Sequence, residues 1–186
     1  MMSDRPFLLD VTRSIATGWT GRHSTGIDRV CDAYLAHYGE RSHAVIQHRG
    51  IVRVLGEALS DSLFALLADR RAGFRARLTR MMPAILAAKS AGVHCAGKVY
   101  LNVGHTDFDL ASHHRWIRRL DLKAVYLVHD LIPIEDAEFC TPHAVRRHTG
   151  RVVNALSGAA GIIVNSRATA ASLQLFAKAN GLPLPP

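Results

Sequence analysis

Short apolar runs alternate with helix-patterned segments along the whole chain, and this alternation constrains the fold most strongly. Four of the runs are continuous and rich in β-branched or aromatic residues: Phe7–Val11, Val99–Val103, Ala124–Val128 and Gly161–Val164. A strand that is apolar on both faces is typical of parallel sheets covered by helices on each side. We therefore expect an α/β protein with a doubly wound, mostly parallel sheet.

The remaining segments complete the expected order of elements. Ala44–His48 and Ile51–Leu55 are predicted to be a pair of strands separated by a glycine-containing turn. Thr12–Ser24 contains Gly18 and Gly21 among several hydroxyl side chains and is predicted to be a loop. Helices are predicted at Thr25–His37, Glu57–Arg71, Arg75–Lys89, Leu110–Leu120, Pro142–Leu156 and Ser166–Ala179.

Length and composition indicate a globular protein. The chain has 186 residues, of which 48% are hydrophobic and 20% charged, enough for one domain or one half of a two-domain protein. No apolar run reaches the ~18 residues needed to span a membrane, and Met1–Pro6 lacks a signal-peptide pattern. The three cysteines lack C-x-x-C spacing, which disfavours a zinc site and a disulfide framework. We expect a cytoplasmic protein.

The net charge of +8 favours an anionic partner. Arginines gather in three clusters: Arg70, Arg71, Arg75, Arg77 and Arg80; Arg115, Arg118 and Arg119; and Arg146, Arg147 and Arg151. Nucleic acid, an anionic membrane surface and a phosphorylated substrate all fit this charge. The chain has no aromatic stacking platform and no helix-turn-helix pattern, which counts against nucleic acid.

A basic amphipathic helix pair is the segment that fits a membrane surface best. Glu57–Arg71 carries leucines on one face, and Arg75–Lys89 carries apolar side chains on one face against Arg75, Arg77 and Arg80. Pro83 is expected to kink the second helix or to end its first turn. Core packing produces the same pattern more often, so peripheral contact with an anionic membrane stays an alternative.

Polar residues follow four of the predicted elements where a parallel sheet binds its ligands. In such sheets the ligand lies outside the carboxyl ends of the strands. The residues expected at that edge are Gly26 to Arg29, Gly104 to Asp107, His129 with Asp130, and Asn165 with Ser166. Alone, His129 could be a buried core histidine and Asp130 a turn cap. Their convergence with three other polar segments makes a binding or catalytic site the better interpretation.

The same segments carry a family resemblance. Thr25-Gly26-Ile27-Asp28-Arg29 is similar to a Gly-Gly-Ile-Gly-Arg loop, with one glycine kept and two replaced. VYLVHDLIP at 125–133 resembles a strand that ends in His-Asp, and GIIVNSRATA at 161–170 resembles a strand followed by a Ser-capped helix. All three belong to the amino-terminal half of GT-B-fold glycosyltransferases of the group-1 type, retaining family four. The nearest likeness is to bacterial mannosyltransferase-like enzymes.

The resemblance implies roles for the residues that match. Residues 1–181 would form a Rossmann-like acceptor-side domain, and 182–186 would begin an interdomain linker. Gly26 and Arg29 would meet the sugar phosphate of the donor, and His129 would be catalytic, binding the transferred sugar. The implied acceptor-side or supporting residues are His105, Asp107, Asp130, Asn165 and Ser166. Asp130 would position His129.

The implied reaction moves a sugar from a nucleotide-sugar to a saccharide or lipid-linked acceptor in polysaccharide or cell-envelope synthesis. It needs no metal and no other cofactor, and nothing here resembles Asp-x-Asp. The family's donor-binding domain, with its Glu-x7-Glu element, is not in these 186 residues. The chain is therefore expected to be inactive alone and to work with a missing carboxyl-terminal domain or a separate donor subunit. A nucleotide-binding module without catalysis and a basic nucleic-acid-binding protein remain alternatives.

Overall fold

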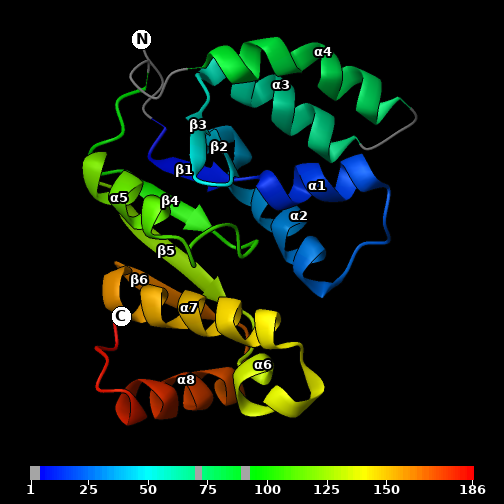
Figure 1. Ribbon diagram of the computed structural model, residues 1–186. Coiled ribbons are helices and arrows are strands. Elements are labelled where there is room, and N and C mark those ends of the chain that lie inside the picture. The colour runs from blue at the N-terminus through cyan, green and yellow to red at the C-terminus, as the bar shows by residue number, and fades with distance from the viewer. Residues whose placement is uncertain (1–4, 70–72, 89–92) are drawn as a thin grey trace.

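The computed structural model describes residues 5–69, 73–88 and 93–186. Six strands of this part form one sheet in the order β3-β2-β1-β4-β5-β6 (Figure 1). Their bounds are β1 Phe7–Asp10, β2 Ser42–His48, β3 Ile51–Val54, β4 Val99–Asn102, β5 Lys123–Val128 and β6 Gly161–Val164. All neighbouring strands pair in parallel except β2 and β3, which form an antiparallel pair. The α/β class and the mostly parallel sheet are confirmed, and the arrangement is compatible with a Rossmann-like fold.

Helices connect the strands, largely where the sequence predicts them. Their bounds are α1 Thr12–Thr20, α2 Gly26–Tyr38, α3 Glu57–Ala68, α4 Phe74–Ala87, α5 Ala111–Arg119, α6 Ile132–Glu135, α7 Pro142–Gly158 and α8 Arg167–Ala179. Ser166 caps α8 as predicted, because its Oγ accepts a hydrogen bond from the Thr169 amide at 3.0 Å. Of the predicted helix ends, Arg70, Arg71 and Lys89 lie outside the described residues.

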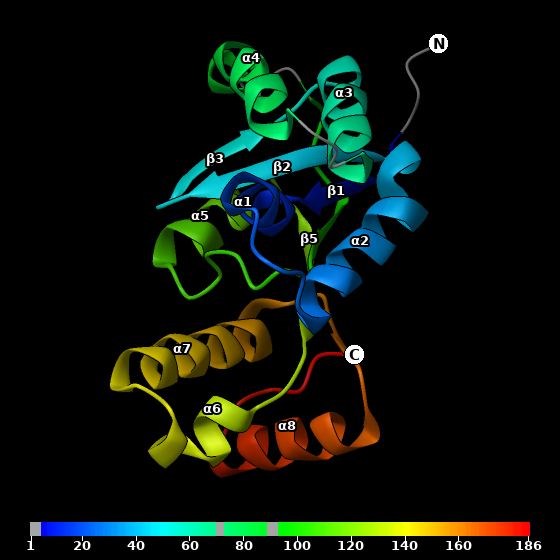
Figure 2. The same ribbon diagram turned by 90° about the vertical axis from the view of Figure 1, so that its right-hand side faces the viewer.

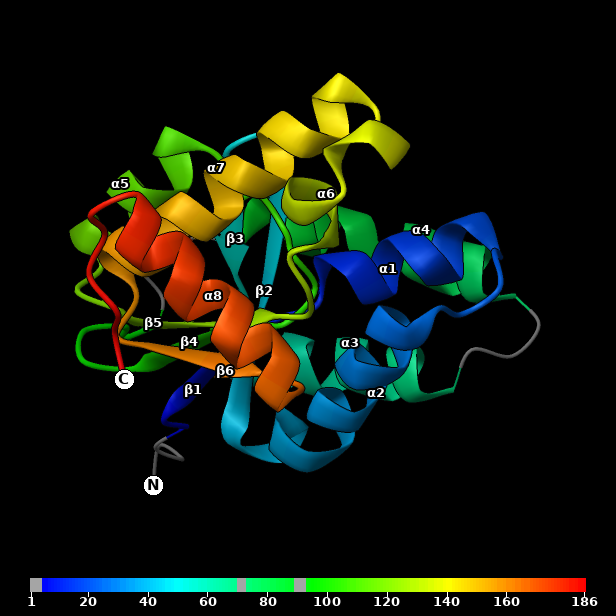
Figure 3. The same cartoon turned by 90° about the horizontal axis from the view of Figure 1, so that it is seen from below.

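The continuous apolar strands are explained by helices on both faces of the sheet. Successive strand residues point to opposite faces. On one face Leu9, Ala44 and Leu101 pack against α1, α2, α3 and α4. On the other, Leu8 and Tyr100 belong to a cluster that includes residues of α5 and α7. Figure 2 shows α2 and α3 on one side of the strands and α5 and α7 on the other, and Figure 3 shows the same layers from below.

The predicted loop at Thr12–Ser24 is wrong over most of its length, because Thr12–Thr20 forms helix α1. Gly18 and Gly21, which suggested a loop, instead lie within the helix and at its end. Gly21 ends the helix in the left-handed conformation, with φ of 65°. Gly18 lies inside the helix, where an added Cβ would come 2.6 Å from a ring atom of Phe74 in α4. Gly18 therefore permits close approach of α1 and α4 rather than a turn.

Pro83 does not end its helix, since α4 continues from Phe74 to Ala87 with the proline inside it. Leu86 of α4 is 60% exposed, but most of the apolar side of α3 and α4 is buried in the core, as Leu63, Leu67 and Leu78 show. These side chains are thus not free to lie on a membrane. In the described part of the chain no helix is long and apolar enough to cross a bilayer.

Residues 182–186 run back beside the outer edge of the sheet. The amide of Ile162 in β6 donates to the carbonyl of Pro186 at 2.9 Å, and Leu182 is tied to the end of α8 by its amide, which donates to Ala177 O. A Cβ at Gly161 would approach the same Pro186 oxygen to 3.1 Å. The proline-rich segment therefore covers part of β6.

We expect Gly18→Ala to lower the free energy of unfolding by about 1–3 kcal/mol, because the new methyl group overlaps the buried Phe74 ring. Urea unfolding of the variant measures this. Phe74→Leu in the same chain is expected to recover part of the loss. Gly26→Ala is the matched control, since nothing lies within 4 Å of its Cβ and its backbone is helical. Equal stability of Gly18→Ala and the native chain would contradict the packing argument.

Candidate functional site

The four predicted polar segments follow the sheet edge at which the parallel strands end. β1 pairs with β2 on one side and with β4 on the other, so the strand order reverses there. Ligands of open α/β sheets bind beside such a reversal. The loop after β4, the residues after β5 and the first turn of α8 all belong to this edge, and α2 packs against β1 beside it. The sheet thus gathers the predicted residues on one side.

Three buried histidines form the centre of this edge. The rings of His105 and His129 lie 4.9 Å apart between centroids, and those of His105 and His148 lie 5.8 Å apart. The exposed fraction of each residue is 8% or less. His148, on α7, was not among the predicted residues. It does not follow a strand in the sequence, and the packing of α7 brings it to this edge.

Backbone carbonyls orient all three rings. His105 Nε2 donates to Leu127 O at 3.0 Å, and His129 Nε2 donates to Val103 O at 2.9 Å. These two bonds cross between β4 and β5 and join the strand ends reciprocally. His148 Nε2 donates to Asp130 O at 2.9 Å. A carbonyl accepts only, so each neutral ring carries its proton on Nε2 and leaves Nδ1 as an acceptor.

Burial lowers the pKa of each histidine in the group. The pKa of His105 falls to about 3, first because of desolvation and then because of the neighbouring His129 and Arg151. Desolvation likewise lowers the pKa values of His129 and His148. The group is neutral at pH 7, and it can offer imidazole acceptors to hydroxyl groups but no positive charge to an anion.

The loop that carries His105 has an unusual backbone. His105 and Asp107 both have positive φ, 62° and 50°, and such conformations cost free energy in residues other than glycine. Asn102 holds the loop in place: its Nδ2 donates to Thr106 O at 2.7 Å, and its Oδ1 accepts from Thr106 N at 3.2 Å. Asp107 Oδ2 also accepts from the amide of Gly50 at 3.4 Å. Strain held by specific bonds is common at functional sites.

A buried polar network lies below the histidines and supports the loop. Asp10 at the end of β1 accepts hydrogen bonds from Gln47 Nε2 at 2.6 Å, from Tyr100 OH at 2.8 Å and from Thr12 N at 3.0 Å. Burial raises the pKa of Asp10, and these bonds oppose the rise. Asn102 Nδ2 donates to the same Tyr100 oxygen at 3.0 Å.

The network continues to the far side of the sheet through His113 of α5. Its Nδ1 donates to Gln47 Oε1 at 2.8 Å, and its Nε2 accepts from Tyr126 OH at 2.8 Å. Burial lowers the pKa of His113 to about 3, so this ring is neutral as well. Hydrogen bonds thereby connect residues of β1, β2, β4, β5 and α5 beneath the candidate site.

The amino end of α2 is held by a buried carboxylate. Asp28 Oδ2 accepts from Thr25 N at 2.8 Å and from Thr25 Oγ1 at 2.7 Å, which forms a capping box. Asp28 Oδ1 accepts from Arg13 Nε at 2.7 Å and from Thr17 Oγ1 at 2.9 Å. Against the opposing effect of burial, these donors lower the pKa of Asp28 below its usual 3.8. Asp28 therefore fixes α1 against the start of α2.

Arg13 connects the amino end of α2 to the buried histidines. Its side chain packs over Gly104, where an added Cβ would come 2.9 Å from Arg13 Cβ, and its charge acts to lower the pKa of His129. Sequence reasoning missed Arg13 because Thr12–Ser24 was predicted to be a loop. It also missed Asp10, although an aspartate that ends an apolar strand was a usable signal.

The predicted residues fall into two groups. His105 and His129 contact each other, whereas Gly26 and Arg29 are exposed at the amino end of α2. No side chain of the described residues lies within 4 Å of a Cβ at Gly26, so packing does not require a glycine there. Arg29 is solvent-exposed on the first turn of α2.

The other supporting residues have mainly structural contacts. Asn165 Oδ1 accepts from Thr169 Oγ1 at 3.1 Å, beside the Ser166 cap, and Thr169 Oγ1 also reaches His129 O at 3.3 Å. Asp130 was expected to orient His129, but the orienting hydrogen bond goes to the Val103 carbonyl. Asp130 contributes its own carbonyl to His148.

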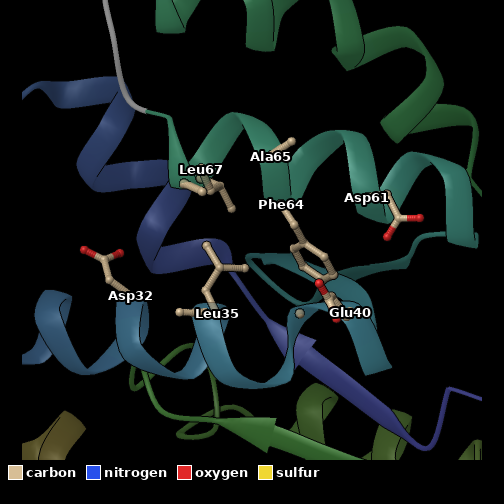
Figure 4. A pocket seen from close by; sticks show the side chains of 10 residues that line it. Asp32, Leu35, Glu40, Asp61, Phe64, Ala65 and Leu67 are labelled. Carbon is tan, nitrogen blue, oxygen red and sulfur yellow. The ribbon is translucent and has the colours of Figure 1, made fainter.

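A cavity of about 620 Å³ lies away from these residues, between α2 and α3. Figure 4 shows Leu35 and Phe64 pointing toward each other from the two helices, with Asp32, Glu40 and Asp61 around them. Asp61 is already bound to Arg5, at 2.8 Å between Oδ1 and Nη1. No residue predicted to be functional lines this cavity.

Comparisons with protein families, with curated proteins and with solved structures find no match. Over residues 5–69, 73–88 and 93–186, no group of three or more His, Cys, Asp or Glu side chains is placed to hold a metal ion.

The neutral histidines predict a loss of stability in mild acid. Their pKa values are lowered in the folded state, so the unfolded chain binds more protons once the pH falls below about 6.5. His105 and His113 together should reduce the free energy of unfolding by about 3 kcal/mol between pH 6.5 and pH 5. Urea unfolding across this range measures the slope. His105→Gln should make the slope shallower by up to about 1.4 kcal/mol per pH unit, the contribution of one proton, and an unchanged slope would show that His105 does not stay neutral.

Asp28→Asn should lower the free energy of unfolding by about 3 kcal/mol at pH 7, because Arg13 and Thr25 lose their buried carboxylate partner. The depressed pKa adds stability above pH 3.8, and this stability is lost as the pH falls through the folded pKa. The deficit of the variant should therefore narrow below about pH 4. Glu40→Gln, at an exposed carboxylate, serves as the control and should change stability by less than about 0.5 kcal/mol.

Proposed function

We propose that this chain is the acceptor-side domain of a group-1, retaining GT-B-type glycosyltransferase, with a doubly wound Rossmann-like fold. The observation that carries the proposal is the pair His129 and His105. Both are buried and neutral, and both lie at the carboxyl ends of adjacent parallel strands beside the reversal of strand order. The family resemblance also supports the proposal. It rests on three motifs: the Thr-Gly-Ile-Asp-Arg segment, the His-Asp strand and the Ser-capped helix.

The neutral state of these histidines suits recognition of a sugar. A neutral imidazole whose Nε2–H is held by a carbonyl has Nδ1 left to accept a hydrogen bond from a hydroxyl group. His129 would bind the transferred sugar in this way. The exposed amino end of α2 adds the positive end of a helix dipole, next to Gly26, for the phosphate of the donor. Arg29 would add a charge to the same phosphate.

The proposed reaction exchanges one C–O bond for another at the anomeric carbon. The bond from C1 to the phosphate oxygen breaks, and its electron pair leaves with the nucleoside diphosphate. The acceptor hydroxyl forms the new bond on the same face, and its proton passes to the departing phosphate oxygen. No side-chain base is therefore required, and the role of His129 is to hold and orient the sugar. The donor's nucleotide would be bound by another domain or subunit.

The proposed setting is the cytoplasmic side of an anionic membrane. With most of the apolar side of α3 and α4 buried in the core, any membrane contact would depend on arginine charge rather than on inserted leucines. Such contact weakens as salt rises. An acceptor linked to a lipid phosphate would be compatible with this setting.

A sugar 1-phosphate tests the site without the donor-binding domain. Titration of the ¹⁵N-labelled chain with glucose 1-phosphate and mannose 1-phosphate should shift the amide signals of Gly26, His105 and His129. His129→Ala should weaken binding about tenfold, the value of one lost hydrogen bond in a buried site. Glu40→Gln should leave it unchanged.

The competing functions give different results in the same experiment. If UMP or GMP shifts the amide signals at the strand ends and the sugar phosphates do not, the result favours a nucleotide-binding module. Steeply salt-dependent binding of DNA or RNA would favour a nucleic-acid partner. Incubation of the purified chain with UDP- or GDP-sugars and a saccharide acceptor should give no product, and transfer by the chain alone would contradict the two-component arrangement.

A further inference from the structure

A separate polar cavity of about 370 Å³ lies on the face of the sheet that carries α5 and α7. The lining residues are Ala111, His114, Arg115 and Arg118 from α5 and Asn154, Ser157 and Gly158 from α7. None of the proposed strand-end site residues is among them, so the cavity is independent of the proposed function.

The lining is rich in hydrogen-bond donors and has no carboxylate. It contains two guanidinium groups, an imidazole, an amide and a hydroxyl group. Arg115 and Arg118 are exposed and three residues apart, which places them on one side of α5. Among the described residues neither forms an ion pair. The arginines of α7 differ, because Arg147 and Arg151 bind Asp109 at 3.0 and 3.3 Å.

The other polar side chains of the cavity are fixed by the protein itself. His114 Nε2 and Asn154 Nδ2 both donate to the carbonyl oxygen of Phe108, at 3.1 and 2.9 Å. This shared acceptor joins α5 and α7 and turns His114 Nδ1 toward Gly158, where a Cβ would come 3.7 Å from it. The wall beneath the two arginines is thus held in position before any ligand binds.

We propose that this cavity binds a phosphate group of a small phosphorylated molecule through Arg115 and Arg118. Guanidinium groups match phosphate oxygens in both charge and geometry. The volume exceeds that of the phosphate alone and falls at the small end of ligand pockets, about 300–1,000 Å³. A phosphomonoester or diphosphate group fits, whether it belongs to a soluble molecule or to a lipid headgroup.

The test compares two variants that remove the same charge. The ¹⁵N-labelled chain is titrated with pyrophosphate, and saturable shifts are expected at the amides of Arg115, Arg118 and Ser157. The variant Arg115→Gln/Arg118→Gln should weaken binding at least tenfold per arginine, about 100-fold together. The matched control Arg119→Gln/Arg146→Gln removes the same charge from two exposed arginines, one on α5 and one on α7, and leaves the lining intact. It should bind as the native chain does.

Vesicles distinguish the two sources of the phosphate. The native chain is sedimented with phosphatidylcholine vesicles that contain phosphatidic acid. If only Arg115→Gln/Arg118→Gln loses this vesicle binding, the cavity binds a lipid headgroup. Pyrophosphate binding without vesicle binding would assign it to a soluble molecule.

Three results would overturn the proposal. The first is the absence of saturable pyrophosphate shifts, and the second is equal weakening in both variants, which would reflect overall charge only. The third is a stability loss in Arg115→Gln/Arg118→Gln that accounts for its weaker binding. That result would assign the two arginines to the carboxyl end of α7, whose last carbonyls carry partial negative charge.

Discussion

A buried carboxylate is the constraint on which the rest of this sheet depends. Asp10 lies at the carboxyl end of β1, the strand at which the strand order reverses, and its side chain is buried. A buried polar group must find hydrogen-bond donors within the protein. Asp10 finds them in Thr12, Gln47 and Tyr100, and this requirement fixes the register of three neighbouring strands.

The hydrogen bonds around Asp10 extend to the candidate site. Tyr100 accepts from Asn102, and Asn102 clamps the loop in which His105 has its positive φ. His105 then bonds to Leu127 of β5, and His129 bonds back to Val103. A continuous set of contacts thus leads from one carboxylate in the core to the two imidazoles at the edge. The position of the histidines is a property of the whole sheet rather than of one loop.

Sequence patterns in this chain predict the features that depend on neighbouring residues, namely the strands and a helix cap. The predicted strands agree with all six strands of the sheet to within two residues, and the serine before α8 identifies its cap. The pairing of His105 with His129 follows from the rule that parallel strands end at one edge. Helix α1 was missed because Gly18 serves a contact with Phe74, fifty-six residues away in sequence. His148 and Arg13 acquire their roles from partners distant in sequence, which no periodicity records, and so does Asp10 through Gln47 and Tyr100.

The segment beside β6 has a consequence for self-association. An edge strand with unpaired backbone groups can template another chain. Here the Ile162 amide is occupied by the carbonyl of Pro186, and the covering segment also contains Pro183 and Pro185. Prolines have no N–H to offer to a further strand. The segment therefore occupies one backbone donor of β6 and has few backbone donors of its own to offer to a further strand.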